Sequence, residues 1–185
     1  MPKTTSTPAT YEDLLKVPDH LVAEIVDGEL FTSPRPGMPH AKAASRLGMK
    51  LGPPFDLGDG GPGGWWIIDE PELHLGRDIL VPDLAAWRRE RMPAYPAGAY
   101  CEITPDWVCE VVSPYTARLD RVYKMPKYAG HSVSYLWLID PAAKTLEVFR
   151  LEKNEWILRA SHGDDHRVRA EPFDAFELAL EPLCA

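Results

Sequence analysis

The stretch Trp107-Val108-Cys109-Glu110-Val111-Val112-Ser113-Pro114 decides the fold of this chain. It is a short apolar run between Pro105 and Pro114, which predicts a buried β-strand. Its one carboxylate, Glu110, would be very costly to bury unless it were paired, hydrogen-bonded or bound to a cation. We therefore expect a functional site at this strand.

A second carboxylate, Asp83, lies in the earlier apolar run Val81-Pro82-Asp83-Leu84-Ala85-Ala86-Trp87. Two carboxylates that converge at one end of a sheet suit Mg²⁺ or Mn²⁺, which prefer oxygen ligands and retain several waters. Lys124 would then orient or deprotonate a water that attacks phosphorus. The spacing of Asp83, Glu110 and Lys124 therefore suits a metal site at which a metal-bound water attacks phosphorus.

Two simpler interpretations of the same residues stay open. Asp83 follows Pro82 and would serve only to cap a turn. Asp120 and Lys124 are four residues apart, and on an exposed helix they would form a surface ion pair of about 0.3–0.5 kcal/mol.

The composition is that of an ordinary globular protein, with 45% hydrophobic and 26% charged residues in 185. A net charge of -8 argues against broad, non-specific coating of nucleic acid, although it leaves room for a local basic cleft. No apolar run reaches the length of a membrane span, and residues 1–10 do not form a signal peptide. Three cysteines without zinc-type spacing predict reduced thiols in a cytoplasmic protein.

Local patterns predict the remaining elements. Asp27-Gly28 between apolar arms from Leu21 to Thr32 indicates a β-hairpin. One apolar face from His40 to Leu51 predicts a helix, which Pro53 and Pro54 should end. A second helix is expected at 116–130, shortened or kinked by Pro126. Strands are expected near 65–69, 72–75, 79–87, 135–140, 145–151 and 156–160. Residues 11–185 are thus predicted to form one α/β or α+β domain after a flexible tail, residues 1–10.

An ordered series of segments carries a family resemblance. It runs through Pro82-Asp83, Cys-Glu-Val-Val-Ser-Pro at Glu110, Asp120-x-x-x-Lys124, Tyr128-Ala129-Gly130, and Tyr-Leu-Trp-Leu-Ile-Asp-Pro at 135–141. With the opening Ala23-to-Leu30 segment and His40, the series resembles the Uma-type restriction endonuclease family, a branch of the PD-(D/E)XK nuclease superfamily. The resemblance covers about residues 11 to 180.

The resemblance implies a restriction-endonuclease-like fold, with a mixed central β-sheet flanked by helices. It implies Mg²⁺-dependent (or Mn²⁺-dependent) endonuclease cleavage of DNA or a related nucleic acid, and a homodimer. Asp83 and Glu110 would be the metal ligands, with Glu24 as an auxiliary acidic residue.

The chain departs from the superfamily pattern at Val112, where the lysine two residues after Glu110 would stand. The resemblance moves that role to Lys124 in the following helix, with Asp120 beside it. Lys127 and Tyr128, within a turn of Lys124, are alternatives.

The role of His40 stays open, since it would either contact the site or a phosphate, or only begin its helix. Two other functions also compete with a nuclease. A non-catalytic binding module would explain the acidic charge and the missing in-strand lysine. A hydrolase of a small phosphoester would explain the lack of a basic surface.

Overall fold

The protein is described by a computed structural model that covers residues 7–163 and 167–184. Its helical segments are α1 (Tyr11–Leu14), α2 (Met38–Leu51), η1 (Gly52–Leu57), η2 (Leu119–Lys124), α3 (Met125–Gly130) and α4 (Glu181–Cys184). The strands before the central pair are β1 (Leu21–Val26), β2 (Glu29–Pro34), β3 (Trp65–Asp69), β4 (Leu73–Leu75) and β5 (Asp78–Leu80). The others are β6 (Leu84–Arg88), β7 (Trp107–Val111), β8 (Tyr135–Asp140), β9 (Thr145–Glu152), β10 (Glu155–Gly163), β11 (Arg167–Val168) and β12 (Leu178–Ala179).

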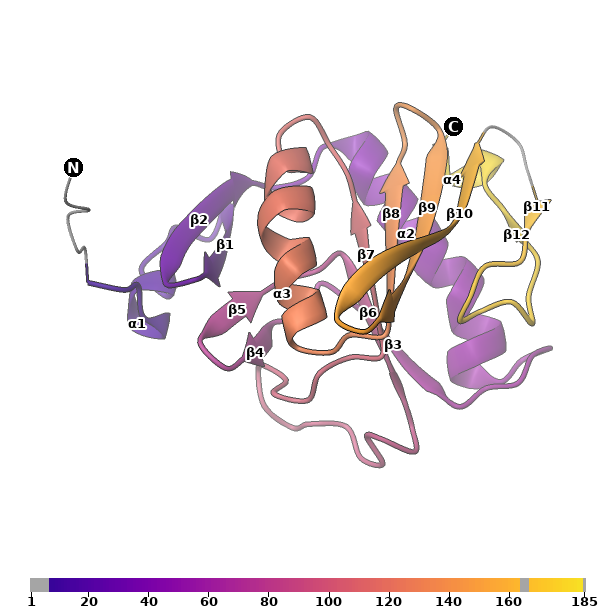
Figure 1. Ribbon diagram of the computed structural model, residues 1–185, viewed down its shortest axis with the longest axis horizontal. Helices are drawn as coiled ribbons and strands as arrows, with labels where there is room; N and C mark the ends of the chain where they lie inside the picture. Colours follow the sequence, from indigo (N-terminus) through magenta and orange to yellow (C-terminus); the bar gives the residue numbers. More distant parts are fainter. Residues whose placement is uncertain (1–6, 164–166, 185) are drawn as a thin grey trace.

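A six-stranded mixed sheet in the order β10-β9-β8-β7-β6-β3 forms the centre of the molecule. Its pairs are antiparallel except β7 and β8, which run parallel. Parallel neighbours need a crossover connection, and here the helical segments η2 and α3 supply it. The smaller sheet β2-β1-β5-β4 lies beside the end of this layer, and α2 and α3 cover opposite faces of the large sheet (Figure 1).

The strand alternation of β7 separates two cores. Trp107 and Cys109 pack with α2 in one buried cluster, whereas Val108 and Val112 pack on the α3 side in another. Because successive side chains point to opposite faces of a sheet, Glu110 projects to the α3 side. The same apolar run that buries the sheet thus aims its single carboxylate at the following helix.

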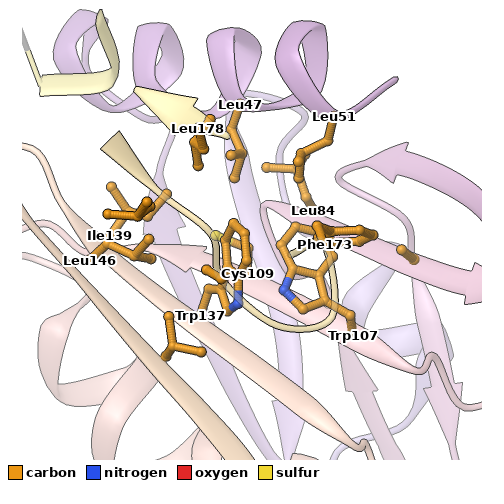
Figure 2. Packing of buried hydrophobic residues seen from close by; sticks show 14 of the residues in the cluster. Leu47, Leu51, Leu84, Trp107, Cys109, Trp137, Ile139, Leu146, Phe173 and Leu178 are labelled. Atoms are coloured by element: carbon orange, nitrogen blue, oxygen red, sulfur yellow. The ribbon is translucent and has the colours of Figure 1, made fainter. Parts of the chain in front are cut away.

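The core on the α2 side is built around aromatic side chains. Trp107 is fully buried, and its ring lies 5.3 Å from that of Trp137 and 5.0 Å from that of Phe173 (Figure 2). Leu47 and Leu51 of α2 close the cluster from the other side. The Trp107 indole N–H is buried and has no hydrogen-bond partner among the described residues.

We expect Trp107→Ala to lower the free energy of unfolding by about 3–5 kcal/mol, because it leaves a large cavity in this core. Trp107→Phe should cost clearly less, since it keeps most of the ring and removes an unpartnered donor. Urea denaturation followed by tryptophan fluorescence and circular dichroism measures both. Leu158→Ala, at a side chain that is half exposed, is the control. A Trp107→Ala loss no larger than that of Leu158→Ala would contradict this packing.

The hairpin prediction is confirmed. β1 and β2 pair antiparallel from Leu21↔Pro34 to Val26↔Glu29. Asp27 (φ 54°) and Gly28 (φ 78°) both have left-handed backbone conformations, as a two-residue turn of this twist requires. The turn is also held from outside, because Ala9 N–H donates to the Gly28 carbonyl at 2.8 Å.

One prediction about element ends is confirmed and another is wrong. α2 ends at Leu51, just before Pro53 and Pro54, and the chain then continues as the π-helix η1 to Leu57. Pro53 lies in the first turn of η1, where a missing N–H is tolerated. The 79–87 run, however, is not one strand. It breaks at residues 81–83 into β5 and β6, which belong to different sheets.

The helix expected over 116–130 is present as η2 followed by α3. Pro126 lies at the start of α3, where its missing N–H is tolerated. Within the ranges that the structure describes, no helix combines the length and apolarity that crossing a membrane would require.

Candidate active site

Asp83 and Glu110 lie side by side at the ends of two neighbouring strands. Leu84 of β6 pairs with Cys109 of β7, so the antiparallel register places Asp83 opposite Glu110. The Val111 N–H donates to Asp83 Oδ2 at 2.7 Å and fixes that carboxylate. Asp83 stands just before β6, where its carbonyl accepts from the Glu70 N–H at 3.0 Å, and its side chain lines the same pocket as that of Glu110.

The ammonium of Lys124 reaches back from η2 to this strand. Lys124 Nζ lies 2.9 Å from Glu110 Oε1 and 2.8 Å from Glu24 Oε1, and it donates to the Val81 carbonyl at 3.1 Å. Glu24 Oε1 also accepts from the Val81 N–H at 2.8 Å. The lysine side chain therefore joins β1, β7 and the break between β5 and β6.

The interpretation of Asp120 and Lys124 as a surface pair is wrong. Asp120 Oδ1 lies 3.9 Å from Lys124 Nζ, but both side chains are buried. They form part of the buried charged group rather than an exposed helix face.

Tyr128 extends the group by one helical turn. Its hydroxyl donates to Glu110 Oε1 at 2.5 Å and is fully buried. Lys127, the other alternative, points away and pairs with Asp27 and Asp78. Among the alternatives for the displaced lysine, the structure thus brings Lys124 and Tyr128 to Glu110 and leaves Lys127 elsewhere.

His40 does more than begin its helix. Its Nε2 lies 3.3 Å from Asp83 Oδ2, and the side chain is buried. Burial lowers the pKa of His40, but the hydrogen bond and charge of Asp83 outweigh it and raise the pKa above its usual value. His40 therefore supports Asp83 from α2, at the same carboxylate oxygen that accepts from the Val111 N–H.

These side chains share one pocket with a volume of about 310 Å³. Glu24, His40, Asp83, Glu110, Asp120 and Lys124 all line it. Its outer walls come from residues 33–37, 113–116 and 141–142, which are far apart in the sequence. Nothing in the sequence patterns marked these walls, because only the folded chain brings the three segments together.

Negative charge dominates the pocket. Burial raises the pKa of Glu110 well above its usual value; Lys124 opposes this, and Asp120, Asp83 and Glu24 add to it. Burial likewise raises the pKa of Asp120 to about 6, against the lowering by Lys124. Burial alone would lower the pKa of Lys124, yet Glu110 and Glu24 raise it well above its usual value. The Lys124 ammonium thus pairs with three carboxyl groups, those of Glu24, Glu110 and Asp120, while Asp83 lies beside Glu110 without an ion pair to that ammonium, so a further cation would stabilise this group of acids.

We expect Asp120 to make the metal-free protein less stable as the pH rises. Its folded pKa of about 6 exceeds the usual 3.8, so its contribution is complete below 3.8 and is lost as the pH rises through 6. Asp120→Asn should flatten this part of the stability curve between pH 4 and pH 7, measured by urea denaturation in chelator. An identical pH dependence in the two proteins would contradict the burial of this carboxyl group.

The donor set fits a small divalent cation. In the described parts of the chain no three His, Cys, Asp or Glu side chains form a ready-made metal cluster. Mg²⁺, however, commonly takes only one or two carboxylates and completes its shell with waters and substrate phosphates. The contacts of Glu110 with Lys124 and Tyr128 both use Oε1, and those of Asp83 with His40 and Val111 both use Oδ2. The second oxygen of each carboxylate could bind a cation without breaking these contacts.

Comparison with known proteins agrees with this architecture. A family model named Uma2, described as "Putative restriction endonuclease", matches residues 8–181. A solved structure from Anabaena variabilis ATCC 29413, titled as a "putative nuclease belonging to DUF820", superposes with a TM-score of 0.75 at 22% identity. That match covers 96% of this chain and 98% of the other, and it supports the predicted restriction-endonuclease-like fold. The search of curated proteins gave no match.

Proposed function

Because this chain belongs to the Uma2 family of restriction-endonuclease-like proteins, we propose that it is a nuclease that hydrolyses phosphodiester bonds with Mg²⁺ or Mn²⁺. We propose DNA, or a related nucleic acid, as its substrate. The observation that carries the proposal is the meeting of Asp83, Glu110 and Lys124 in one pocket. The pairing of two carboxylates with an ammonium suits phosphoryl transfer, which depends mainly on positioning and charge stabilisation.

Asp83 and Glu110 would hold the cation, and Glu24 and Asp120 would add negative charge around it. A bound Mg²⁺ would supply charge neutralisation at the phosphoryl oxygens and a more acidic water. In the net reaction one P–O bond forms to the water oxygen, one P–O ester bond breaks, and the leaving alcohol takes a proton. His40 and the Val111 N–H keep Asp83 in place during this exchange.

Lys124 would act as a cation. In the metal-free protein burial alone would lower the pKa of Lys124, but Glu110 and Glu24 raise it well above its usual value, which favours the charged ammonium. Its contacts with Glu110 and Glu24 hold the ammonium at the pocket floor. From there it would orient water and stabilise the negative charge that builds on phosphorus, and of the two roles expected from the sequence this is the one we propose.

The direct test is cleavage by the purified full chain. Labelled single- and double-stranded DNA and RNA are incubated with the protein in Mg²⁺, Mn²⁺ or EDTA. We expect metal-dependent products that EDTA abolishes. A protein that binds nucleic acid or a protein partner tightly but cleaves nothing under these conditions would instead be the non-catalytic module.

The setting of the enzyme is also part of the proposal. Cys101 and Cys109 are free thiols, as is usual in the reducing cytoplasm, and we propose a cytoplasmic protein. A homodimer, which would let two sites act on two strands, stays a prediction. Analytical ultracentrifugation at several concentrations tests it.

A further inference from the structure

The catalytic groups lie at the bottom of the pocket rather than on an open surface. The side chains of Glu110 and Lys124 are each 3% exposed, and those of Glu24 and Asp83 are 6% and 14% exposed. A phosphate in a continuous duplex is fixed on the outside of a wide, stiff rod. Such a phosphate could not reach a buried floor unless its nucleotide left the stack.

The pocket is also narrow. Its volume of about 310 Å³ falls at the lower end of the range for small-molecule sites, about 300–1,000 Å³. Its walls include the proline-rich residues 34–39, together with Pro114, Tyr115 and Pro141. Rigid proline walls do not open easily, because their backbone φ angles are locked. The space suits one nucleotide unit and excludes the width of a double helix.

Tyr115 presents an unusually exposed ring at the rim of this pocket. It is 85% exposed, more than any other large hydrophobic residue in the described part of the chain. The turn that carries it is well ordered by hydrogen bonds. Ser113 N–H donates to Thr116 Oγ1 at 3.2 Å, and Ala117 N–H donates to the Ser113 carbonyl at 2.9 Å. An exposed tyrosine on an ordered turn, four residues after β7, offers a ring that stacks on no other aromatic side chain among the described residues.

Arg35, which also lines this pocket, adds a positive charge to its rim. Its side chain is 59% exposed, and it is tethered by a hydrogen bond to the Asp19 carbonyl at 2.9 Å and a long contact to Glu70 at 3.9 Å. Proteins that bind unpaired strands use positive side chains along the backbone and aromatic rings on which the bases stack. The rim of this pocket carries a side chain of each kind, Arg35 and Tyr115. The net charge of -8 offers no broad positive face along which a duplex would lie.

We propose that the substrate of this pocket is an unpaired nucleic-acid strand, with one base stacked on Tyr115 and the adjoining phosphate at the pocket floor. Arg35 contacts a neighbouring phosphate. This inference deepens the proposed nuclease function and rests on it. Cleavage would therefore fall in single-stranded segments, flaps or frayed ends, and not within an intact duplex.

The test compares three substrates in Mn²⁺: a labelled oligonucleotide, the same strand annealed to its complement, and a nucleotide-sized phosphodiester. We expect cleavage of the single strand to be at least about ten-fold faster than that of the duplex. Tyr115→Ala should raise KM for the single strand by about five- to 150-fold, the range that loss of one stacked base implies. Tyr115→Trp should keep wild-type KM, because it retains a ring for stacking.

Two controls isolate the stacking. Tyr95→Ala removes another exposed tyrosine ring, at the second pocket of the molecule, and should leave KM unchanged. An oligonucleotide with an abasic site next to the cleaved bond should be bound equally by wild type and Tyr115→Ala. If instead Tyr115→Ala weakens both oligonucleotides equally, the ring does not stack on that base.

The possible failures are distinguishable. Duplex cut as fast as single strand, with Tyr115→Ala unaffected, would overturn the inference while the nuclease function stands. Cleavage of the small diester alone would overturn it as well. If nothing is cleaved, the nuclease function fails. Fluorescence anisotropy in EDTA, which measures binding without cleavage, still tests whether Tyr115 binds a single strand. Single strand must then bind more tightly than duplex, and Tyr115→Ala must remove the difference.

Discussion

Asp83→Asn and Glu110→Gln are each expected to lower metal-dependent cleavage by about 100- to 1,000-fold or more, the loss typical of removing a preorganised charge-stabilising group. Both substitutions keep the size and remove only the negative charge. In Glu110→Gln the amide oxygen can still accept from Tyr128 and Lys124, and in Asp83→Asn it can still accept from the Val111 N–H. The fold should therefore survive, and the loss should appear in kcat of the cleavage reaction.

Glu155→Gln is the matched control, because this exposed carboxylate begins β10 away from the pocket. It should cleave like wild type, and all three variants should give wild-type circular dichroism. Full activity in Asp83→Asn or in Glu110→Gln would contradict the assignment of that carboxylate. Equal loss in Glu155→Gln would show that general charge, and not the pocket, controls the rate.

Lys124→Met should have the second large effect, on stability as well as on activity. Methionine keeps the stem of the side chain but leaves Glu24 and Glu110 facing each other in a buried site. Breaking a buried ion pair from one side typically costs about 3–5 kcal/mol. We expect a loss of this size in urea denaturation, together with loss of cleavage.

A double-mutant cycle separates pairing from packing. Adding Glu110→Gln to Lys124→Met removes the stranded charge, so the double variant should recover part of the stability, with a coupling of about 0.5–3 kcal/mol. Strictly additive losses would mean that Lys124 and Glu110 do not interact. Lys127→Met is a helix control of the same residue type, since Lys127 pairs outside the pocket and should leave cleavage unchanged.

Much of the site was predictable because its parts lie in strong local patterns. The apolar run around Glu110 predicted β7, and the apolar run that follows Asp83 predicted β6. The departure at Val112 has a physical counterpart in the structure. Val112 packs in the apolar cluster on the α3 side, and the Lys124 ammonium comes to Glu110 from the next helix instead.

The rest could not be read from periodicity, because it depends on contacts between distant segments. The break at residues 81–83 divides one apolar run between two sheets. At this break Asp83 lines the pocket, and the Val81 carbonyl accepts from Lys124. The contact of Glu24 with Lys124 joins β1 to η2, two elements that are about 100 residues apart in the sequence. The proline rule predicted the end of α2 at Leu51, but it did not predict that the π-helix η1 would follow directly with Pro53 and Pro54 in it.

Isothermal titration of Mn²⁺ into the chelator-treated protein tests the central claim most directly, that Asp83 and Glu110 hold a catalytic cation. Wild type and Glu155→Gln should bind the ion alike, and Asp83→Asn and Glu110→Gln should each weaken binding by at least about ten-fold. Equal Mn²⁺ binding in all four proteins, or none in wild type, would contradict it.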